Sequence, residues 1–210
     1  MRRSRICVLA AGTLLAAAAG IAGTASAAAA GMSSHISRPV NASITAVPPI
    51  AAAADPFNLA NFLSTVIGRR ICLGISGGVD EGPAIVFACN THPDQEWHFG
   101  NAFPGDAVYS QIINGNNDCL SLQGGNTATG TQLVARDCGP IIDSNQHKDQ
   151  FWFPTAVDCS GYHPLLNLKA TQAHNGTDFV AGTRNHGTAN GTAVEIRKYE
   201  NVCNDQFWSP

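Results

Sequence analysis

The sequence comprises 210 residues, of which 7% are aromatic and 13% are charged. It has 12 Lys and Arg against 15 Asp and Glu, a formal charge of −3, so it lacks the basic excess that a nucleic-acid-binding surface needs. Once the N-terminal segments described next are set aside, the remaining length suits one domain with a substantial core.

The N-terminus has the features of a secretory signal peptide. Three arginines between residues 2 and 5 form a positive region, residues 6–18 are apolar, and Ala25-Ser26-Ala27 has the small-residue pattern of a cleavage site. A transmembrane anchor is the alternative, but glycines interrupt the apolar run and no charged stop-transfer flank follows it. We expect residues 1–27 to be removed, which leaves 9 of the 12 basic residues and all 15 acidic ones, a charge of −6. The mature chain is then secreted, extracellular and not inserted in a membrane.

Residues 28–54 are rich in Ala, Ser and Pro, contain no aromatic residue and carry almost no charge. Such a segment cannot bury enough apolar surface to order itself, so we interpret it as a flexible or extended linker. The domain then covers residues 55–210, where frequent Gly, Asn and Thr favour short strands joined by turns.

The start of this domain is compatible with two structures. Asp55 followed by Pro56 could begin a short helix that runs to Ile67. The apolar residues between Phe62 and Ile67 suit a first strand equally well, and we favour the strand.

The most informative feature is a motif that recurs three times. Each copy reads Asp-Gln-x-Trp, and the tryptophans at positions 97, 152 and 208 are separated by 55 and 56 residues. A strand-like run, a Gly-rich turn and a second apolar run precede the motif in the same order. The first runs are Cys72–Ile75, Cys119–Leu122 and Leu165–Leu168, and the second runs end at Cys89, Cys138 and Tyr199.

These features together resemble the ricin-B lectin repeat, over roughly residues 57–210. The resemblance implies an all-β, disulfide-stapled β-trefoil with pseudo-threefold symmetry, in which three four-stranded units of about 57–105, 106–158 and 159–210 surround one axis. Closing three such units into a barrel also leaves no free sheet edge. The motif tryptophans are expected to pack the core, with each motif Gln holding a turn. These tryptophans are Trp97, Trp152 and Trp208.

Six cysteines remain after removal of the leader, an even number in an oxidising compartment, and fifteen pairings are possible. The repeat register pairs the first Cys of a repeat with the second. In the third repeat Leu165 and Tyr199 stand at these positions, and the two displaced cysteines are left to pair with each other. The predicted disulfides are Cys72–Cys89, Cys119–Cys138 and Cys159–Cys203. Metal binding is disfavoured because no C-x2-C or H-x3-H pair occurs, so we expect no metal and no cofactor.

One enzyme-like motif is present. Gly74-Ile75-Ser76-Gly77-Gly78 matches G-x-S-x-G, but a nucleophile elbow needs a strand, a sharp turn and then a helix. Gly82 and Pro83 would break a helix here, and the segment aligns with a turn of the repeat. We therefore expect a non-catalytic protein.

The resemblance also implies how a sugar is bound. Active repeats of the family use an Asp two residues after the first Cys, an aromatic two residues before the second Cys, and polar residues at and before the motif Gln. Together these give hydrogen-bond acceptors and an apolar platform. In this chain the Asp position holds Gly74, Ser121 and Asn167, and the aromatic position holds Phe87, Arg136 and Arg197. No repeat has a complete set.

The first repeat keeps the aromatic platform, so sugar binding is expected to depend on Phe87, with hydrogen bonds from Asp94 and Gln95. The alternative is that Phe87 is a core residue. The third repeat offers a second polar set, which consists of Asn167, Glu195, Asp205 and Gln206.

Two functions remain. One is a secreted carbohydrate-binding protein with degenerate sites, whose partner is a glycan or polysaccharide. The other is a trefoil used for contact with another protein, such as a secreted inhibitor or toxin-associated subunit, with the long third-repeat segment 171–190 as the contact loop.

Overall fold

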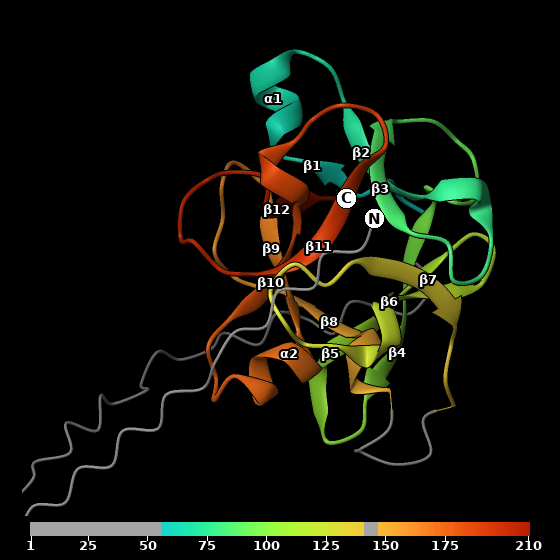
Figure 1. Cartoon of the computed structure of the whole chain (residues 1–210), viewed down its shortest axis with the longest axis vertical. Helices are drawn as coiled ribbons and strands as arrows, with labels where there is room; N and C mark the ends of the chain where they lie inside the picture. Colours follow the sequence, from blue (N-terminus) through green and yellow to red (C-terminus); the bar gives the residue numbers. More distant parts are fainter. Residues whose placement is uncertain (1–55, 141–146) are drawn as a thin grey trace, which may run out of the picture. The chain divides into compact units, whose positions relative to one another are not determined.

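The computed structural model describes residues 56–140 and 147–210. The predicted signal peptide (1–27) and the predicted linker (28–54) lie outside the described residues. Within the described part the chain consists of short strands, turns and two short helices (Figure 1). Neither helix in this part is long and apolar enough to cross a membrane.

Strands dominate the order of elements. The strands are β1 Ala60–Asn61, β2 Ile71–Ile75, β3 Ala84–Ala88, β4 Trp97–Phe103, β5 Asp106–Asn114, β6 Asp118–Leu122, β7 Leu133–Asp137, β8 Phe151–Pro154, β9 His163–Asn167, β10 Phe179–Thr183, β11 Thr192–Lys198 and β12 Phe207–Ser209. The helices are α1 Leu63–Ile67 and α2 Leu168–Ala173, and the 3-10 turns are η1 Ser76–Gly78, η2 Gln123–Gly125, η3 Lys148–Gln150 and η4 Arg184–His186.

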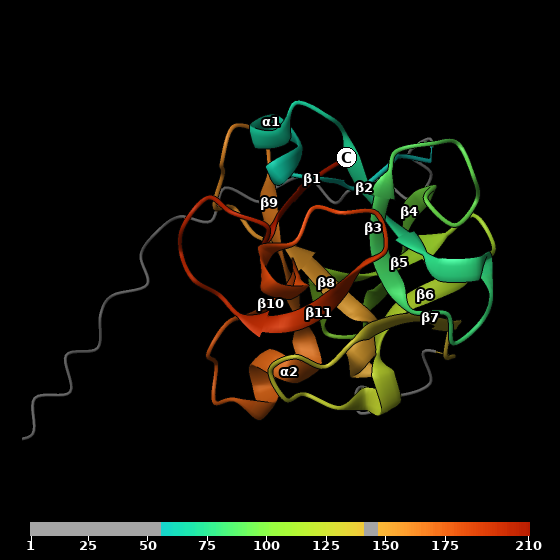
Figure 2. The same cartoon turned by 45° about the horizontal axis from the view of Figure 1, so that its top comes forward.

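Three hairpins of the same construction give the fold its threefold character. In β2–β3, β6–β7 and β10–β11, five residues of each strand pair in antiparallel register, and a 3-10 turn follows the first strand. Strand β11 also pairs with β3, and isolated bridges join the β3 and β11 hairpins to the β7 hairpin, so the three hairpins meet (Figure 2). All the strands of the described part belong to one sheet. The predicted all-β, disulfide-stapled β-trefoil is confirmed.

The motif tryptophans occupy equivalent places in the core. All three are buried. The indole N–H of each donates to a main-chain carbonyl on the first strand of its hairpin: Trp97 to Leu73 at 3.0 Å, Trp152 to Leu120 at 2.9 Å and Trp208 to Ala181 at 3.0 Å. Because the same two atoms are joined in every repeat, this bond fixes how the three repeats align.

That alignment corrects the predicted first strand of the third repeat. The sequence interpretation placed it at Leu165–Leu168, but the strand that pairs with β11 and accepts the Trp208 hydrogen bond is β10. The apolar run at 165–168 forms β9, which pairs with β8 and β12, and the start of α2. The prediction was wrong because β10 carries Val180 where the first two repeats carry Cys, which hid the strand from the repeat signal.

The corrected alignment also changes which residue of the third repeat stands at the position where the sequence analysis expected a hydrogen-bond acceptor for sugar. Gly182 of β10, not Asn167, stands where Gly74 and Ser121 stand in the first two repeats. Asn167 is buried at the end of β9, where its Oδ1 accepts from the Ala170 N–H at 3.0 Å and caps α2. The third repeat therefore has no side chain at the acceptor position.

The start of the domain is also different from the favoured prediction. Only Ala60 and Asn61 form a strand, and the predicted strand at 62–67 is instead the helix α1. The Asn61 Oδ1 accepts from the Leu63 N–H at 3.0 Å, and Gly68 ends the helix with φ of 69°. Val66 is largely exposed, so the apolar residues of this segment do not all face the core.

The six cysteines of the described residues form the three predicted disulfides: Cys72–Cys89, Cys119–Cys138 and Cys159–Cys203. The first two join the strands of the first and second hairpins close to their ends. The third joins the segment before β9 to the segment before β12. In the chain-entropy account each contributes about 3–4 kcal/mol to stability.

Peptide mapping of the unreduced mature protein is expected to recover these three linked pairs and no others. The hairpin disulfides depend on the strand register. In the first hairpin Ile71 pairs with Ala88, and the next residue on each strand's C-terminal side is a cysteine of the disulfide, Cys72 and Cys89. A free thiol at any of these positions, or a pair that links two hairpins, would contradict the observed pairing.

Candidate functional site

A hollow in the first repeat lies between the β2–β3 hairpin and the turn that leads to Trp97. Its volume is about 340 Å³, within the range of roughly 300–1,000 Å³ that small-molecule sites occupy. It is open to solvent on the outside of the hairpin. The lining residues include Gly74, Ser76, Phe87, Asn90, His92, Asp94 and Gln95.

Phe87 provides the aromatic surface of this hollow. It lies on β3 opposite Cys72, and 41% of its surface is exposed, whereas the core residue Val86 beside it is fully buried. Alternation along the strand places Phe87 on the outer face. The ring is therefore available as a platform and is not a core residue.

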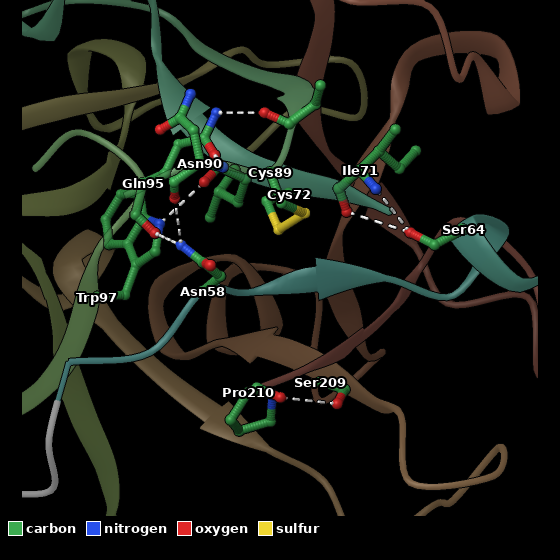
Figure 3. The surroundings of a disulfide bond; sticks show 12 residues. Asn58, Ser64, Ile71, Cys72, Cys89, Asn90, Gln95, Trp97, Ser209 and Pro210 are labelled. Carbon is green, nitrogen blue, oxygen red and sulfur yellow. Dashed lines mark hydrogen bonds between the residues drawn. A yellow bond between two sulfur atoms is a disulfide. The ribbon is translucent and has the colours of Figure 1, made fainter. Parts of the chain in front are cut away.

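Gln95 is committed to the local backbone. Its Oε1 accepts from the Asn90 N–H at 2.9 Å and its Nε2 donates to the Ala88 carbonyl at 3.3 Å (Figure 3). The motif glutamines of the other repeats bond in the same way, Gln150 to Asp137 and Gly139, and Gln206 to Lys198 and Glu200. Gln95 and Gln206, predicted as sugar ligands, thus hold the turns, the role the sequence analysis gave to each motif Gln.

The Asp94 carboxylate is free. It is partly exposed and forms no hydrogen bond with any residue that the structure describes. A Cβ on Gly74 would lie 3.2 Å from the Asp94 Oδ2 and 2.8 Å from the Gln95 Cγ, so the missing side chain at Gly74 leaves room for both. The Asp94 carboxylate thereby reaches the space that a side chain at position 74 would fill.

In the second repeat the equivalent carboxylate is occupied. The Ser121 hydroxyl donates to the Asp149 Oδ2 at 2.8 Å, and both residues are buried. The platform position holds Arg136, whose guanidinium pairs with Glu81 at 2.9 Å. The carboxylate equivalent to Asp94 and the platform position of the second repeat are therefore both engaged, although a hollow of about 520 Å³ remains beside Arg136 and Gln150.

In the third repeat the equivalent carboxylate has still more partners within the protein. The Asp205 carboxylate is fully buried, and it accepts from the Thr183 N–H and hydroxyl and from Arg197 Nη1 and contacts His186 Nδ1. Arg197 occupies the platform position and also pairs with Glu200 at 2.7 Å. These contacts satisfy Asp205 from within the protein.

The predicted third-repeat set does not come together. Glu195 lies opposite Gly182 on the hairpin and pairs with Arg184 at 2.9 Å. Asn167 is buried at the junction with the second repeat, and its Nδ2 donates to the Asp149 carbonyl at 3.0 Å. Asn167 is therefore structural.

Asn90, His92 and Ser76 also line the first-repeat hollow, and none of them was predicted as a ligand. A structural pattern was not predicted either: Asn61 and Asn167 lie at equivalent places and donate from Nδ2 to the carbonyls of Asp205 and Asp149. The recurrence of Asn at positions 61, 114 and 167 was the available signal.

The G-x-S-x-G motif does not form a nucleophile elbow. Ser76 begins the 3-10 turn η1, and the next element of the chain is the strand β3 rather than a helix. Ser76 lines the hollow, so its hydroxyl can contribute a hydrogen bond to a ligand.

A separate group of carboxylates lies outside the hollow. Oxygen atoms of Asp80, Asp118 and Asp137 lie within 4.8 Å of one another. Burial raises the pKa of Asp118 above its ordinary value of 3.8, the charges of Asp80 and Asp137 raise it further, and the neighbouring Asn114 amide lowers it. The folded protein therefore favours the protonated form of Asp118 more than the unfolded chain does.

This shift predicts a pH dependence of stability. A raised carboxyl pKa contributes stability that is present below the ordinary pKa and is lost as the pH rises through the folded-state pKa. In chelator-containing buffer, the melting temperature at pH 5 minus that at pH 7 is expected to be larger for the parent protein than for Asp118→Asn. Equal differences in the two proteins would show that Asp118 has no shifted pKa.

No family model matches the sequence, and no curated protein matches it. Solved structures do match the fold. The designed threefold-symmetric protein ThreeFoil superposes with a TM-score of 0.59 at 16% identity, over 73% of this chain and 96% of ThreeFoil. The Rhizoctonia solani agglutinin gives 0.54 at 15% identity, over 77% of this chain and 96% of the agglutinin. An exo-β-1,3-galactanase from Clostridium thermocellum gives 0.59 at 18% identity, over 75% of this chain but only 30% of the galactanase. At these identities the likeness shows the β-trefoil fold.

Proposed function

We propose that the mature chain is a secreted, non-catalytic carbohydrate-binding protein of the ricin-B type that binds a sugar in the first-repeat hollow. The observation that carries this proposal is the state of three equivalent carboxylates. Asp149 and Asp205 are bonded within the protein, whereas Asp94 forms no hydrogen bond among the described residues and lines the same hollow as the exposed Phe87 ring.

The two groups suit the two surfaces of a pyranose. The face of the sugar that carries axial hydrogens is apolar and stacks on the Phe87 ring, which removes apolar area from water. The hydroxyl groups at the edge donate to the Asp94 carboxylate in charge-assisted hydrogen bonds. With one short platform and one carboxylate, we expect a dissociation constant on the order of 1 mM, about −4 kcal/mol.

The charge of the hollow selects against acidic sugars. Its lining includes the Asp94 carboxylate and contains no Lys or Arg. A uronic or sialic acid would place a second carboxylate near Asp94 without a cation to compensate it, so neutral sugars are the proposed ligands.

Binding is expected to be monovalent. Opening the second or third position would require breaking the Ser121–Asp149 bond or the contacts of Arg197 and His186 with Asp205. Isothermal titration with a bound sugar should give one site per chain, and the protein should not cross-link glycan-coated particles. A stoichiometry of two or three would contradict monovalent binding.

The test of the proposal is a glycan array probed with the mature chain, with hits titrated by NMR. Asp94→Asn keeps the shape of the hollow but replaces a charged acceptor with a neutral one, and we expect an affinity loss of about tenfold. Asp178→Asn is the matched control, because Asp178 is an exposed aspartate whose side chain forms no hydrogen bond among the described residues. An unchanged affinity in Asp94→Asn would place the sugar elsewhere.

The second candidate is a trefoil that contacts another protein. The bonds that Asp149 and Asp205 form within the protein favour it, since they make two of the three equivalent carboxylates unavailable to a sugar. A blank array, together with no NMR shifts at millimolar concentrations of neutral sugars, would favour this role over sugar binding.

A further inference from the structure

The 3-10 turn that follows the first strand of each hairpin has different charged neighbours in the three repeats. These turns are η1, η2 and η4, and their last residues are Gly78, Gly125 and His186, each with φ between 55° and 64°. In all three repeats this residue lies beside the Asp of the Asp-Gln-x-Trp motif. The repeats differ in the side chain that accompanies this Asp.

In the second and third repeats the companion is a basic side chain of the protein itself. A Cβ on Gly125 would lie 2.5 Å from the Lys169 Nζ and 4.0 Å from the Asp149 Cγ, so the ammonium reaches the turn that borders this carboxyl group. In the third repeat Arg197 pairs with Asp205 at 3.3 Å. Each of these two motif aspartates therefore has a positive charge of the chain nearby.

In the first repeat the companion is neutral. A Cβ on Gly78 would lie 3.6 Å from the Asn116 Nδ2 and 3.8 Å from the Asp94 Cβ, so an amide stands where the second repeat has the Lys169 ammonium. This amide donates to the Gly78 carbonyl at 3.2 Å. No ion pair of the residues that the structure describes includes Asp94, and the lining of its hollow contains no Lys or Arg. Asp94 therefore keeps an uncompensated negative charge.

A neutral sugar in the hollow would leave this charge without a partner. Its hydroxyl groups donate hydrogen bonds to the carboxylate but bring no positive charge. The exposed Phe87 ring adds a second preference, because the face of an aromatic ring attracts a cation within about 6 Å of its centre. A ligand with both a sugar ring and an ammonium group would satisfy the aromatic platform and the carboxylate together.

We infer, on the premise that the first-repeat hollow binds a sugar as proposed, that its preferred ligand is an amino sugar, a hexosamine with a free amine as in a de-N-acetylated polysaccharide. The pyranose ring stacks on Phe87, and the ammonium group at the ring edge donates to the Asp94 carboxylate in place of a hydroxyl. The ligand then supplies the positive charge that Lys169 and Arg197 supply in the other repeats. Because Asp94 is partly exposed, the gain over a neutral sugar is modest, about fivefold in affinity.

NMR titration of the mature chain with three methyl glycosides tests this inference. The sugars are glucosamine, N-acetylglucosamine and glucose, at pH 7, where an amine with a pKa near that of an α-amino group, about 7.7–8.0, is mostly protonated. Glucosamine should bind about fivefold more tightly than the other two. Raising the NaCl concentration from about 0.05 M to about 0.5 M should remove most of this preference, because salt screens a charge pair at the surface.

Two variants and one control assign the preference to the carboxylate. Asp94→Asn removes the charge, so glucosamine and glucose should then bind equally. Asn116→Lys places an ammonium where Lys169 stands in the second repeat, and it should also remove the preference. Glucose should bind this variant as it binds the parent protein, because Asn116 does not line the hollow. The control Asp178→Asn should keep the fivefold difference.

The outcomes distinguish the amino-sugar preference from sugar binding itself. Equal affinities for glucosamine and glucose in the parent protein would overturn the preference and leave the sugar site standing, and so would a preference that survives in Asp94→Asn. Binding of Nα-acetyl-lysine amide as tightly as glucosamine would also overturn it, because the hollow would then recognise an ammonium group alone, as on a protein partner. Failure of all three sugars to bind would contradict the sugar site and the preference together.

Discussion

Phe87→Ala is expected to abolish sugar binding and to leave the melting temperature nearly unchanged. The ring is the aromatic platform of the first-repeat hollow, and 41% of its surface is exposed. The other repeats have Arg136 and Arg197 at the equivalent positions, which are engaged in ion pairs and cannot provide an apolar face in its place. Since the expected affinity is only on the order of 1 mM, loss of the stacking surface removes most of the binding free energy.

The measurement is an NMR titration with the best sugar from the array, with thermal unfolding run in parallel. Val108→Ala is the matched control, because Val108 is also an exposed apolar residue but lies on β5, outside the lining of the hollow. Phe87→Tyr should retain binding, since it keeps the ring. Full binding by a folded Phe87→Ala variant would move the site away from the first repeat, and a large loss of stability would mean that the ring packs structurally.

Trp152→Ala is expected to have the largest effect on stability. Its side chain is completely buried in the core, and its indole N–H donates to the Leu120 carbonyl at 2.9 Å. Truncation leaves a cavity and an unpaired buried carbonyl, which together should lower the free energy of unfolding by about 3–5 kcal/mol.

Chemical denaturation of the oxidised protein measures this change. Trp152→Phe should lose less, because it keeps much of the packing and loses only the hydrogen bond and part of the ring. Trp97→Ala and Trp208→Ala should cost similar amounts, since both residues make the same bond in their own repeats. A loss below about 1 kcal/mol for Trp152→Ala would contradict its role as a core residue of the trefoil.

Much of the fold could be predicted because the same short sequence motif recurs three times. The three Asp-Gln-x-Trp motifs carried the resemblance that implied a β-trefoil, and in the structure each Trp makes the same bond to its own hairpin. The register of the hairpins then predicted the disulfides. The prediction failed where local signals are ambiguous. At β10 a Val replaces the marker Cys. At α1 an apolar run that suits a strand forms a short helix, which ends at Gly68 in the left-handed conformation.

The candidate site was predicted only in part, for a related reason. Phe87 and Asp94 follow from their positions in the repeat, and the structure places both in one hollow. Gln95 and Asn167 were also predicted as ligands, but hydrogen bonds to the main chain commit them to the backbone. A polar residue at a given motif position can face a ligand or the backbone, and the motif does not distinguish the two.

The sequence by itself determined the repeat architecture and, through the repeat register, predicted the cysteine pairing that the structure shows. These features depend on residue types at fixed intervals. Only the tertiary structure decided which carboxylate stays free, because Asp205 is satisfied by Thr183, His186 and Arg197, none of which belongs to its motif.

The acidic cluster is the clearest case of a feature that the sequence did not reveal. Asp80 and Asp137 are 57 residues apart, and no spacing rule joins a turn of one repeat to a strand of the next. The sequence contains no C-x2-C or H-x3-H pair, so no metal site was predicted from it. Packing of the first hairpin against the second brings the carboxylates together, so the electrostatic field of that surface is a property of the folded chain alone.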